Sequence, residues 1–72
     1  MTTDTINQYF STVQSGQIYR CVIETTEKML IEKALAQSSG NQLIAARILG
    51  LNRNTLRTKI KKLKIDFRGF KL

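Results

Sequence analysis

The sequence of 72 residues contains no histidine, no proline, no tryptophan and only one cysteine. A single cysteine excludes an intrachain disulfide, and the lack of histidine excludes a zinc site built from cysteine and histidine. We therefore expect a reducing compartment and no metal or other cofactor. Without proline, and with four glycines as the strongest breakers, long uninterrupted helices are expected. Aromatic residues make up only 7 % of the chain, so an all-α protein with a core of aliphatic helix faces is predicted.

Residues that perform catalysis are equally scarce. The five carboxylates are scattered, and no glycine-rich phosphate-binding loop is present, so the sequence predicts neither an enzyme nor a small-molecule substrate. No apolar run approaches the roughly 18 residues that a membrane span requires. The N-terminus also lacks the charged and apolar regions of a signal peptide. We predict a cytoplasmic protein.

The net charge of +7 is distributed unevenly along the chain. Residues 1–46 hold three cations against four anions, whereas residues 47–72 hold nine Lys and Arg against Asp66 alone. A positive field concentrated in this way favours a polyanionic partner. The alternative interpretation is a basic surface that is simply solvated.

Two helices are predicted in the first half of the chain. In residues 4–14 the apolar side chains recur at helical spacing, and either Asp4 or Thr5 can cap the start. After a short loop, a longer helical pattern runs from Ile18 towards Gly40, which suits the left-handed conformation that follows a helix. The broad apolar stripe of this longer helix comprises Ile18, Tyr19, Val22, Ile23, Met29, Leu30, Ala34 and Leu35.

This long helix carries more apolar surface than the rest of one chain can cover. About 20 residues of helix span roughly 30 Å, and the two-helix unit predicted at residues 41–63 covers only part of that length. The simplest additional cover is the same helix of a second chain, so residues 1–39 are predicted to form the core of a homodimer. The alternative is a monomer in which residues 4–14 fold back over the stripe.

Residues 41–63 have the pattern of a helix-turn-helix. Asn41 can cap a helix over residues 42–49, because its side-chain oxygen can accept a backbone N–H of the first turn. Ala45 and Ala46 supply the small side chains that a close helix crossing needs. The first helix of the unit is therefore expected to pack tightly against its neighbours.

The turn and the second helix complete the unit. Gly50 permits a tight turn, and Asn52 can cap the helix that follows. Leu56, Ile60 and Leu63 recur at i, i+4 and i+7, so they are predicted to face inward while the cations between them face outward.

The second helix carries donors suited to the major groove of DNA. Arg53 and Arg57 are four residues apart, and each offers a planar fork that can pair with guanine O6 and N7 or clamp a phosphate. Asn54 can pair with adenine or with the local backbone, and both assignments stay open. Three lysines suit phosphates better than bases, because an ammonium group discriminates little by geometry. These are Lys59, Lys61 and Lys62.

A second function class fits the same residues. A basic amphipathic helix at residues 53–64 is also typical of a protein that lies on an anionic membrane surface. Helix formation on anionic vesicles without affinity for duplex DNA would favour this alternative.

Several segments resemble the Fis-type helix-turn-helix family: Gly-Asn-Gln at 40–42, Ala-Ala-Arg at 45–47, Leu-Gly-Leu-Asn-Arg-Asn-Thr-Leu-Arg at 49–57, and Lys-Ile-Lys-Lys-Leu at 59–63. The likeness covers about residues 8–65. The family includes the nucleoid protein Fis and the C-terminal DNA-binding domains of NtrC-type bacterial enhancer-binding activators. The Asn-Arg-Asn-Thr motif and the Ile-Asp ending resemble the NtrC branch, whereas a short chain starting with Met resembles free-standing Fis.

The resemblance implies a four-helix, intertwined homodimer that regulates transcription and bends bacterial DNA, with its last helix in the major groove. The whole chain is predicted to be one domain, with dimerisation helices in residues 1–39 and the helix-turn-helix in 41–63. Residues 64–72 mix basic and apolar side chains, and Gly69 breaks any helix there, so they are predicted to form a basic tail. Matching positions imply groove and backbone contacts for Asn52, Arg53, Thr55 and Arg57, and a phosphate contact for Asn41. The complete set of predicted DNA-binding residues is Asn41, Asn52, Arg53, Asn54, Thr55, Arg57, Lys59, Lys61 and Lys62.

Overall fold

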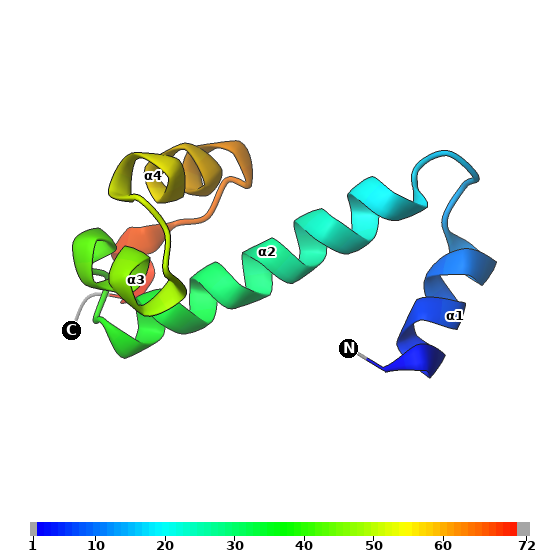
Figure 1. The fold of residues 1–72 in the computed structure, drawn as a ribbon, viewed down its shortest axis with the longest axis horizontal. Coiled ribbons are helices and arrows are strands. Elements are labelled where there is room, and N and C mark those ends of the chain that lie inside the picture. The colour runs from blue at the N-terminus through cyan, green and yellow to red at the C-terminus, as the bar shows by residue number, and fades with distance from the viewer. Residues whose placement is uncertain (1, 71–72) are drawn as a thin grey trace.

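The computed structural model describes residues 2–70, which form four α-helices and one short 3-10 helix (Figure 1). These are α1 (Thr3–Thr12), α2 (Ile18–Gln37), α3 (Gln42–Leu49), α4 (Arg53–Lys62) and η1 (Phe67–Phe70). No strand occurs between residues 2 and 70, so the predicted all-α, four-helix class is confirmed. Helix α2 forms the long axis of a molecule that measures 38 × 21 × 20 Å; α1 lies beside its first turns, and α3 and α4 gather at its other end (Figure 1).

The first helix starts earlier than the sequence pattern indicated. Thr2 is the N-cap of α1, because its hydroxyl oxygen accepts a hydrogen bond from the backbone N–H of Thr5 at 3.2 Å. The prediction of Asp4 or Thr5 as the cap was therefore wrong. Asp4 instead lies in the first turn, where its negative charge interacts favourably with the helix dipole.

Helix α2 ends in a turn that contains two left-handed residues. Gly40 has φ +81°, as predicted, and its N–H donates to the carbonyl of Leu35 at 2.8 Å. Ser39 precedes it with φ +52°. The bond from Gly40 to Leu35 satisfies a carbonyl of the last helical turn and directs the chain back towards α2. Helix α3 can therefore begin after one further residue.

The hydrophobic core lies entirely at one end of the molecule. Eight hydrophobic residues are buried: Ile31, Ala34, Leu35, Ala45, Ala46, Leu56, Ile60 and Ile65. They come from the C-terminal half of α2, from α3, from α4 and from the segment after α4. The predicted inward positions of α4 are confirmed, since Leu56 and Ile60 are buried and Leu63 packs partly buried against them.

The segment that follows α4 belongs to this core. Residues 64–72 were expected to form a basic tail, but Ile65 is buried and the aromatic rings of Phe67 and Phe70 pack against the core. The N–H of Ile65 donates to the carbonyl of Ile60 at 3.0 Å, which turns the chain inward directly after the helix. Within residues 64–70 the expectation of a tail outside the fold was wrong; residues 71 and 72 lie outside the described range.

The N-terminal half is open by comparison. No residue of α1 is buried, and Phe10 and Tyr19 expose 65 % and 81 % of their surface. Of the predicted stripe on α2, only Ala34 and Leu35 are buried, whereas Ile31, which the stripe omitted, is fully covered. The exposed large apolar residues of α1 and α2 form what we call the open apolar surface. It comprises Phe10, Tyr19, Ile23, Met29 and Leu30.

Candidate nucleic-acid interface

The turn between α3 and α4 is built as the sequence predicts. Gly50 adopts φ +73°, and a Cβ at this position would meet nothing within 4 Å. Glycine is therefore favoured here by the left-handed backbone and not by lack of space. Ala45 and Ala46 are both buried in the contact between α3 and the rest of the core. The small residues and the turn together bring α4 against α2 and α3.

Two asparagines hold the starts of the helices. The side-chain oxygen of Asn41 accepts the N–H groups of Leu43 at 3.0 Å and Ile44 at 3.2 Å, and that of Asn52 accepts the N–H of Asn54 at 2.8 Å. Both predicted caps are confirmed. These bonds fix the orientation of the side chains, and the amide N–H₂ groups of Asn41 and Asn52 are the donors that can bond an outside acceptor such as a phosphate.

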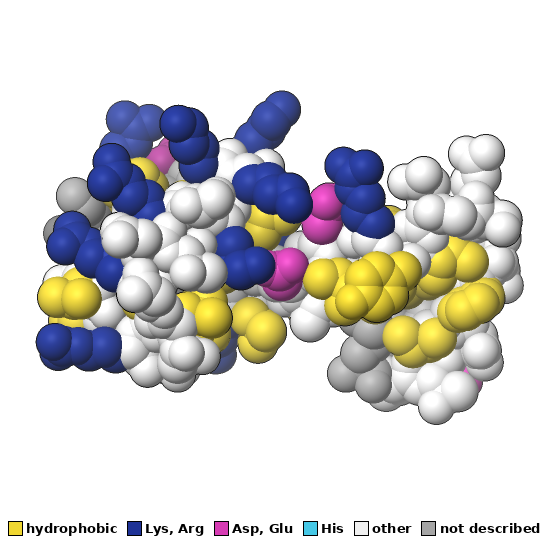
Figure 2. Space-filling view, turned by 45° about the horizontal axis from the view of Figure 1, so that its top comes forward, with side chains coloured by type: hydrophobic (Ala, Val, Ile, Leu, Met, Phe, Trp, Pro, Cys, Tyr) yellow, Lys and Arg dark blue, Asp and Glu magenta, His cyan; other side chains and the backbone are white. Residues whose placement is uncertain are grey.

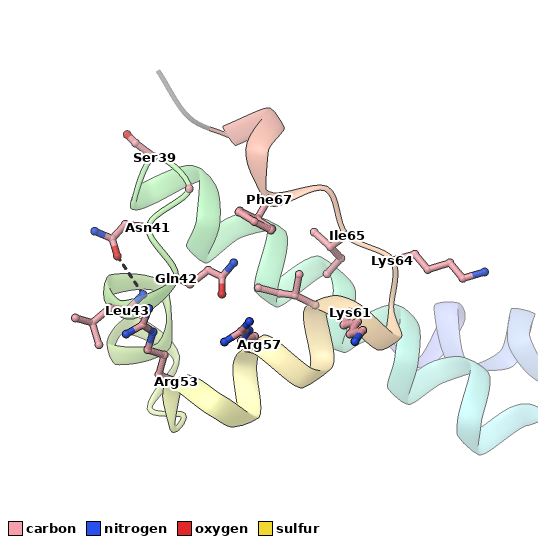
Figure 3. Close-up of a pocket in the computed structure, with 12 residues that line it drawn as sticks. Ser39, Asn41, Gln42, Leu43, Arg53, Arg57, Lys61, Lys64, Ile65 and Phe67 are labelled. Carbon is pink, nitrogen blue, oxygen red and sulfur yellow. Dashed lines mark hydrogen bonds between the residues drawn. The ribbon is translucent and has the colours of Figure 1, made fainter.

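Cations line one side of α4. Arg53, Arg57 and Lys61 recur every four residues and are all exposed, which places them on one face of the helix. They lie along an open groove between the start of α3, α4 and the segment after α4, with Arg53 at one end and Lys61 towards the other (Figure 3). Over about 12 Å of helix the row presents three charges to solvent.

The other predicted site residues on α4 lie beside this row. Asn54, Thr55 and Lys62 are exposed, so each is accessible to a ligand. The backbone carbonyl of Asn54 accepts a hydrogen bond from the hydroxyl of Thr58 at 3.0 Å. Asn54 thus contributes its backbone to the helix and keeps its side chain at the surface.

Lys59 is different from the other lysines of α4. Its ammonium group pairs with the carboxylate of Glu27 on α2 at 2.5 Å, and both side chains are half-buried. The pair joins residues that are 32 positions apart in the sequence. Lys59 therefore fastens α4 to α2, and its charge is already compensated within the protein.

Most of the remaining positive charge in this half is uncompensated. Among the described residues the ion pairs are Arg20–Glu24, Lys59–Glu27 and Arg68–Asp66. In the space-filling view, Lys and Arg side chains crowd the end of the molecule that contains α3 and α4 (Figure 2). This end has the charge and shape to contact a polyanion.

Residues 22–63 match the family described as bacterial regulatory protein, Fis family. The chain belongs to this family. The matched segment covers most of α2 and all of α3 and α4, which are the elements that carry the core and the cation row. The resemblance drawn from the sequence is confirmed.

Relatives of the Fis-family domain fall into two groups. The chain is 42 % identical over 71 residues to the DNA-binding transcriptional regulator NtrC of Azospirillum brasilense, and 41 % over 67 residues to that of Rhizobium meliloti. These matches cover 92 % and 88 % of the chain but only 15 % and 14 % of the relatives. It is 34 % identical over 62 residues to a protein of Ralstonia nicotianae named as a Fis-like DNA-binding protein, with 82 % of the chain and 80 % of that relative covered. No solved structure matches the chain.

The membrane-surface alternative is not supported by the Fis-family domain. Insertion of α4 into a lipid surface requires a free apolar face, but Leu56 and Ile60 are buried in the core. Within the described residues, no helix is long and apolar enough to cross a membrane. The basic face of α4 is therefore backed by protein.

One residue of the groove was missed by sequence reasoning. Lys64 lines the same groove as Arg57 and Lys61 but was assigned to the tail. The spacing of three residues from Lys61 was the available signal, and the end of the helix at Lys62 concealed it. Within residues 2–70, no group of three or more His, Cys, Asp or Glu side chains is placed to hold a metal ion.

Proposed function

We propose that this chain binds duplex DNA as a sequence-preferring homodimer, with α4 in the major groove, and acts in the regulation of bacterial transcription. The observation that carries the proposal is the exposed row Arg53, Arg57 and Lys61 on a helix whose opposite face is anchored in the core. A helix held in this way keeps its donors at fixed positions, which reading of base edges requires. The names of the relatives in both groups state DNA binding.

The residues of the interface divide into two classes. Arg53 and Arg57 stand on the first two turns of α4 and are assigned to base edges, with Asn54 and Thr55 beside them. Phosphates are assigned to flexible lysines and to helix starts. These phosphate-binding residues are Asn41, Asn52, Lys61 and Lys62. Lys59 is better assigned to the ion pair with Glu27 than to DNA.

The open apolar surface is the basis for the homodimer. Side chains as large as Tyr19 and Phe10 are left exposed on α1 and α2, and apolar residues gather on this part of the molecule (Figure 2). A second copy of the same surface would cover them. Two α4 helices on one dimer would then enter successive major grooves, which are about 34 Å apart on straight DNA, and a shorter separation would require the duplex to bend.

The proposed DNA-binding function fits two kinds of protein, because the chain covers very different shares of its two groups of relatives. The chain spans about 15 % of the length of the NtrC relatives and 80 % of the Fis-like relative. It can serve as the DNA-binding domain of an NtrC-type activator or as a free-standing Fis-like protein at the bacterial nucleoid. In either case the proposed contribution of these residues is binding, without catalysis.

Arg57→Ala and Lys61→Ala form a matched pair to test the assignment. Both side chains are exposed, lie on one face of α4 and make no ion pair among the described residues. Duplexes selected from random sequence for tight binding, and unselected duplexes, are titrated over a range of salt. Arg57→Ala is expected to weaken binding to the selected duplex by about 1–3 kcal/mol. Lys61→Ala is expected to weaken both duplexes equally and to reduce the salt slope by about 0.9 per subunit.

Two results would contradict the proposal. If the unchanged protein shows no salt-dependent affinity for any duplex, DNA is not its partner. If Arg57→Ala affects selected and unselected duplexes alike, Arg57 does not read bases. Parallel titrations with anionic vesicles test the membrane-surface alternative, which binding to vesicles without affinity for duplex DNA would favour.

A further inference from the structure

Helix α4 ends in a conformation that normally calls for glycine. Lys64 has φ +56°, in the left-handed region, and follows the C-cap residue Leu63. The N–H of Lys64 donates to the carbonyl of Lys61 at 3.2 Å, and the N–H of Ile65 donates to the carbonyl of Ile60 at 3.0 Å. These bonds close the helix, and the burial of Ile65 and Ile60 holds the turn in place.

A lysine is a poor residue for this backbone. Side chains with a Cβ adopt the left-handed region at an energetic cost that glycine avoids. The other left-handed turn near the groove places Ser39 in the same region at φ +52°, whereas the turn after α3 uses Gly50. The fold alone therefore does not explain why position 64 carries a lysine.

The location of Lys64 supplies a reason. It lines the groove that Arg53, Arg57 and Lys61 also line, and it continues their row beyond the end of α4 (Figure 3). Its side chain extends outward from the end of the groove opposite Arg53 (Figure 3). Among the described residues Lys64 makes no ion pair, so its charge is available to an outside anion.

We propose that Lys64 is a phosphate-binding residue that extends the DNA interface past the end of α4. In this proposal, the left-handed turn directs the ammonium group of Lys64 towards the same DNA strand that Lys61 contacts, further along its phosphate backbone. The contact is electrostatic and does not depend on sequence. This inference rests on the proposed function, since it assumes that duplex DNA occupies the groove.

Substitution by glycine separates stability from binding, because the two are expected to change in opposite directions. Lys64→Gly relieves the left-handed backbone and is expected to raise Tm by about 4 °C. The same variant is expected to weaken binding to every duplex about fivefold per subunit at 0.1 M salt and to reduce the salt slope by about 0.9 per subunit. Thermal unfolding and salt-dependent titration of a labelled duplex provide both measurements.

Two further variants control for the backbone and for the charge. Ser39→Gly relieves a left-handed residue at the end of α2 without removing a charge, so Tm should rise while the salt slope stays unchanged. Lys64→Asn keeps a side chain that tolerates the left-handed region but removes the charge. It should weaken DNA binding as Lys64→Gly does, with a smaller change in Tm.

The outcomes distinguish the two proposals. Suppose that the unchanged protein binds duplex DNA and that Lys64→Gly binds it with the same affinity and the same salt slope. This result would overturn the role of Lys64 and leave the proposed function intact. A Tm of Lys64→Gly below that of the unchanged protein would also overturn it, because the conformational argument would then be wrong. Failure of the unchanged protein to bind any duplex would refute the proposed function itself.

Discussion

The two halves of this molecule are both built from helices, but they differ in how many of their hydrophobic side chains are buried. All eight buried hydrophobic residues lie between Ile31 and Ile65, and none lies in α1 or in the first turns of α2. The N-terminal half is not poor in apolar side chains; it exposes Phe10, Tyr19 and Ile23 instead. The C-terminal half therefore has a hydrophobic core of its own, whereas the large apolar side chains of the N-terminal half remain exposed in a single chain.

Charge is also distributed unequally between the two ends of the chain. Residues 1–46 are nearly neutral, whereas the cations concentrate in residues 47–72. A neutral apolar surface favours association with protein, and a cationic surface opposes self-association and favours a polyanion. The two halves are thus suited to two different partners, a second copy of the chain and DNA. Substitutions in each half should affect different measurements.

The largest difference is expected between two leucines of α2. Leu35 is 0 % exposed and Leu30 is 53 % exposed, although they lie five residues apart on the same helix. Leu35→Ala should lower the free energy of unfolding by about 3–5 kcal/mol, because it leaves a cavity in the core. Leu30→Ala should lower it by less than about 1 kcal/mol at concentrations where the chain is monomeric. Urea unfolding followed by circular dichroism measures both.

The effect of protein concentration on the stability of the two variants provides a further test. If the open apolar surface joins two chains, the effect of Leu30→Ala should grow as the protein concentration rises above the dimer dissociation constant. Equal effects of the two variants at every concentration would show that α2 is buried uniformly, which would contradict the comparison of the two halves.

A charge in the open apolar surface is expected to have the next largest effect. Ile23 is 40 % exposed beside the shallow apolar hollow between α1 and α2. Ile23→Glu would place a carboxylate in the proposed interface and weaken the dimer by about 2 kcal/mol, which is roughly thirtyfold in the dissociation constant. Sedimentation equilibrium should then give a mass nearer the 8.2 kDa of one chain than twice that value.

Lys28→Glu is the matched control for this variant. It also introduces a carboxylate, with a larger change of net charge, but at an exposed polar position of the same helix, so the mass should not change. An unchanged protein that sediments at 8.2 kDa at micromolar concentration would remove the homodimer from the proposed function, and the comparison would then need another partner for α1 and α2.

Local signals made most of the fold predictable. The bounds of α3 and α4 follow from Asn41 and Asn52 as caps and from Gly50 at the turn, each of which acts within a few residues of its position. The packing of residues 65–70 was missed because Ile65, Phe67 and Phe70 are spaced by two residues and then by three, so they do not repeat with the period of either a strand or a helix. Their burial depends on the end of α4, which turns the chain towards the core.

The candidate site divides in the same way. The spacing of Arg53 and Arg57 predicts a shared face, and the structure exposes both on that face. The assignment of Lys59 to phosphate could not anticipate its partner, because Glu27 is 32 residues away and only the packing of α4 on α2 brings them together. Contacts between distant segments are determined by tertiary packing, and no local pattern reports them.

The pair of Glu27 and Lys59 provides the smallest but most specific prediction. Both side chains are half-buried, so the coupling between them should be about 0.5–1 kcal/mol in a double-mutant cycle of Glu27→Gln and Lys59→Met. Lys61→Met is the control, since Lys61 is exposed and makes no ion pair among the described residues. It should show no coupling to Glu27→Gln. Urea unfolding of the three single variants, of the two double variants that contain Glu27→Gln and of the unchanged protein measures both couplings.

Exchange of the two charges tests what the pair does for DNA binding. Lys59→Glu alone would place two carboxylates face to face and should disturb the contact between α4 and α2. Combined with Glu27→Lys, it would restore an ion pair of reversed polarity at the same place. If Lys59 only positions α4, the double variant should recover most of the sequence preference for the selected duplex. If the double variant regains stability but still loses affinity for all duplexes with a lower salt slope, Lys59 contacts phosphate directly.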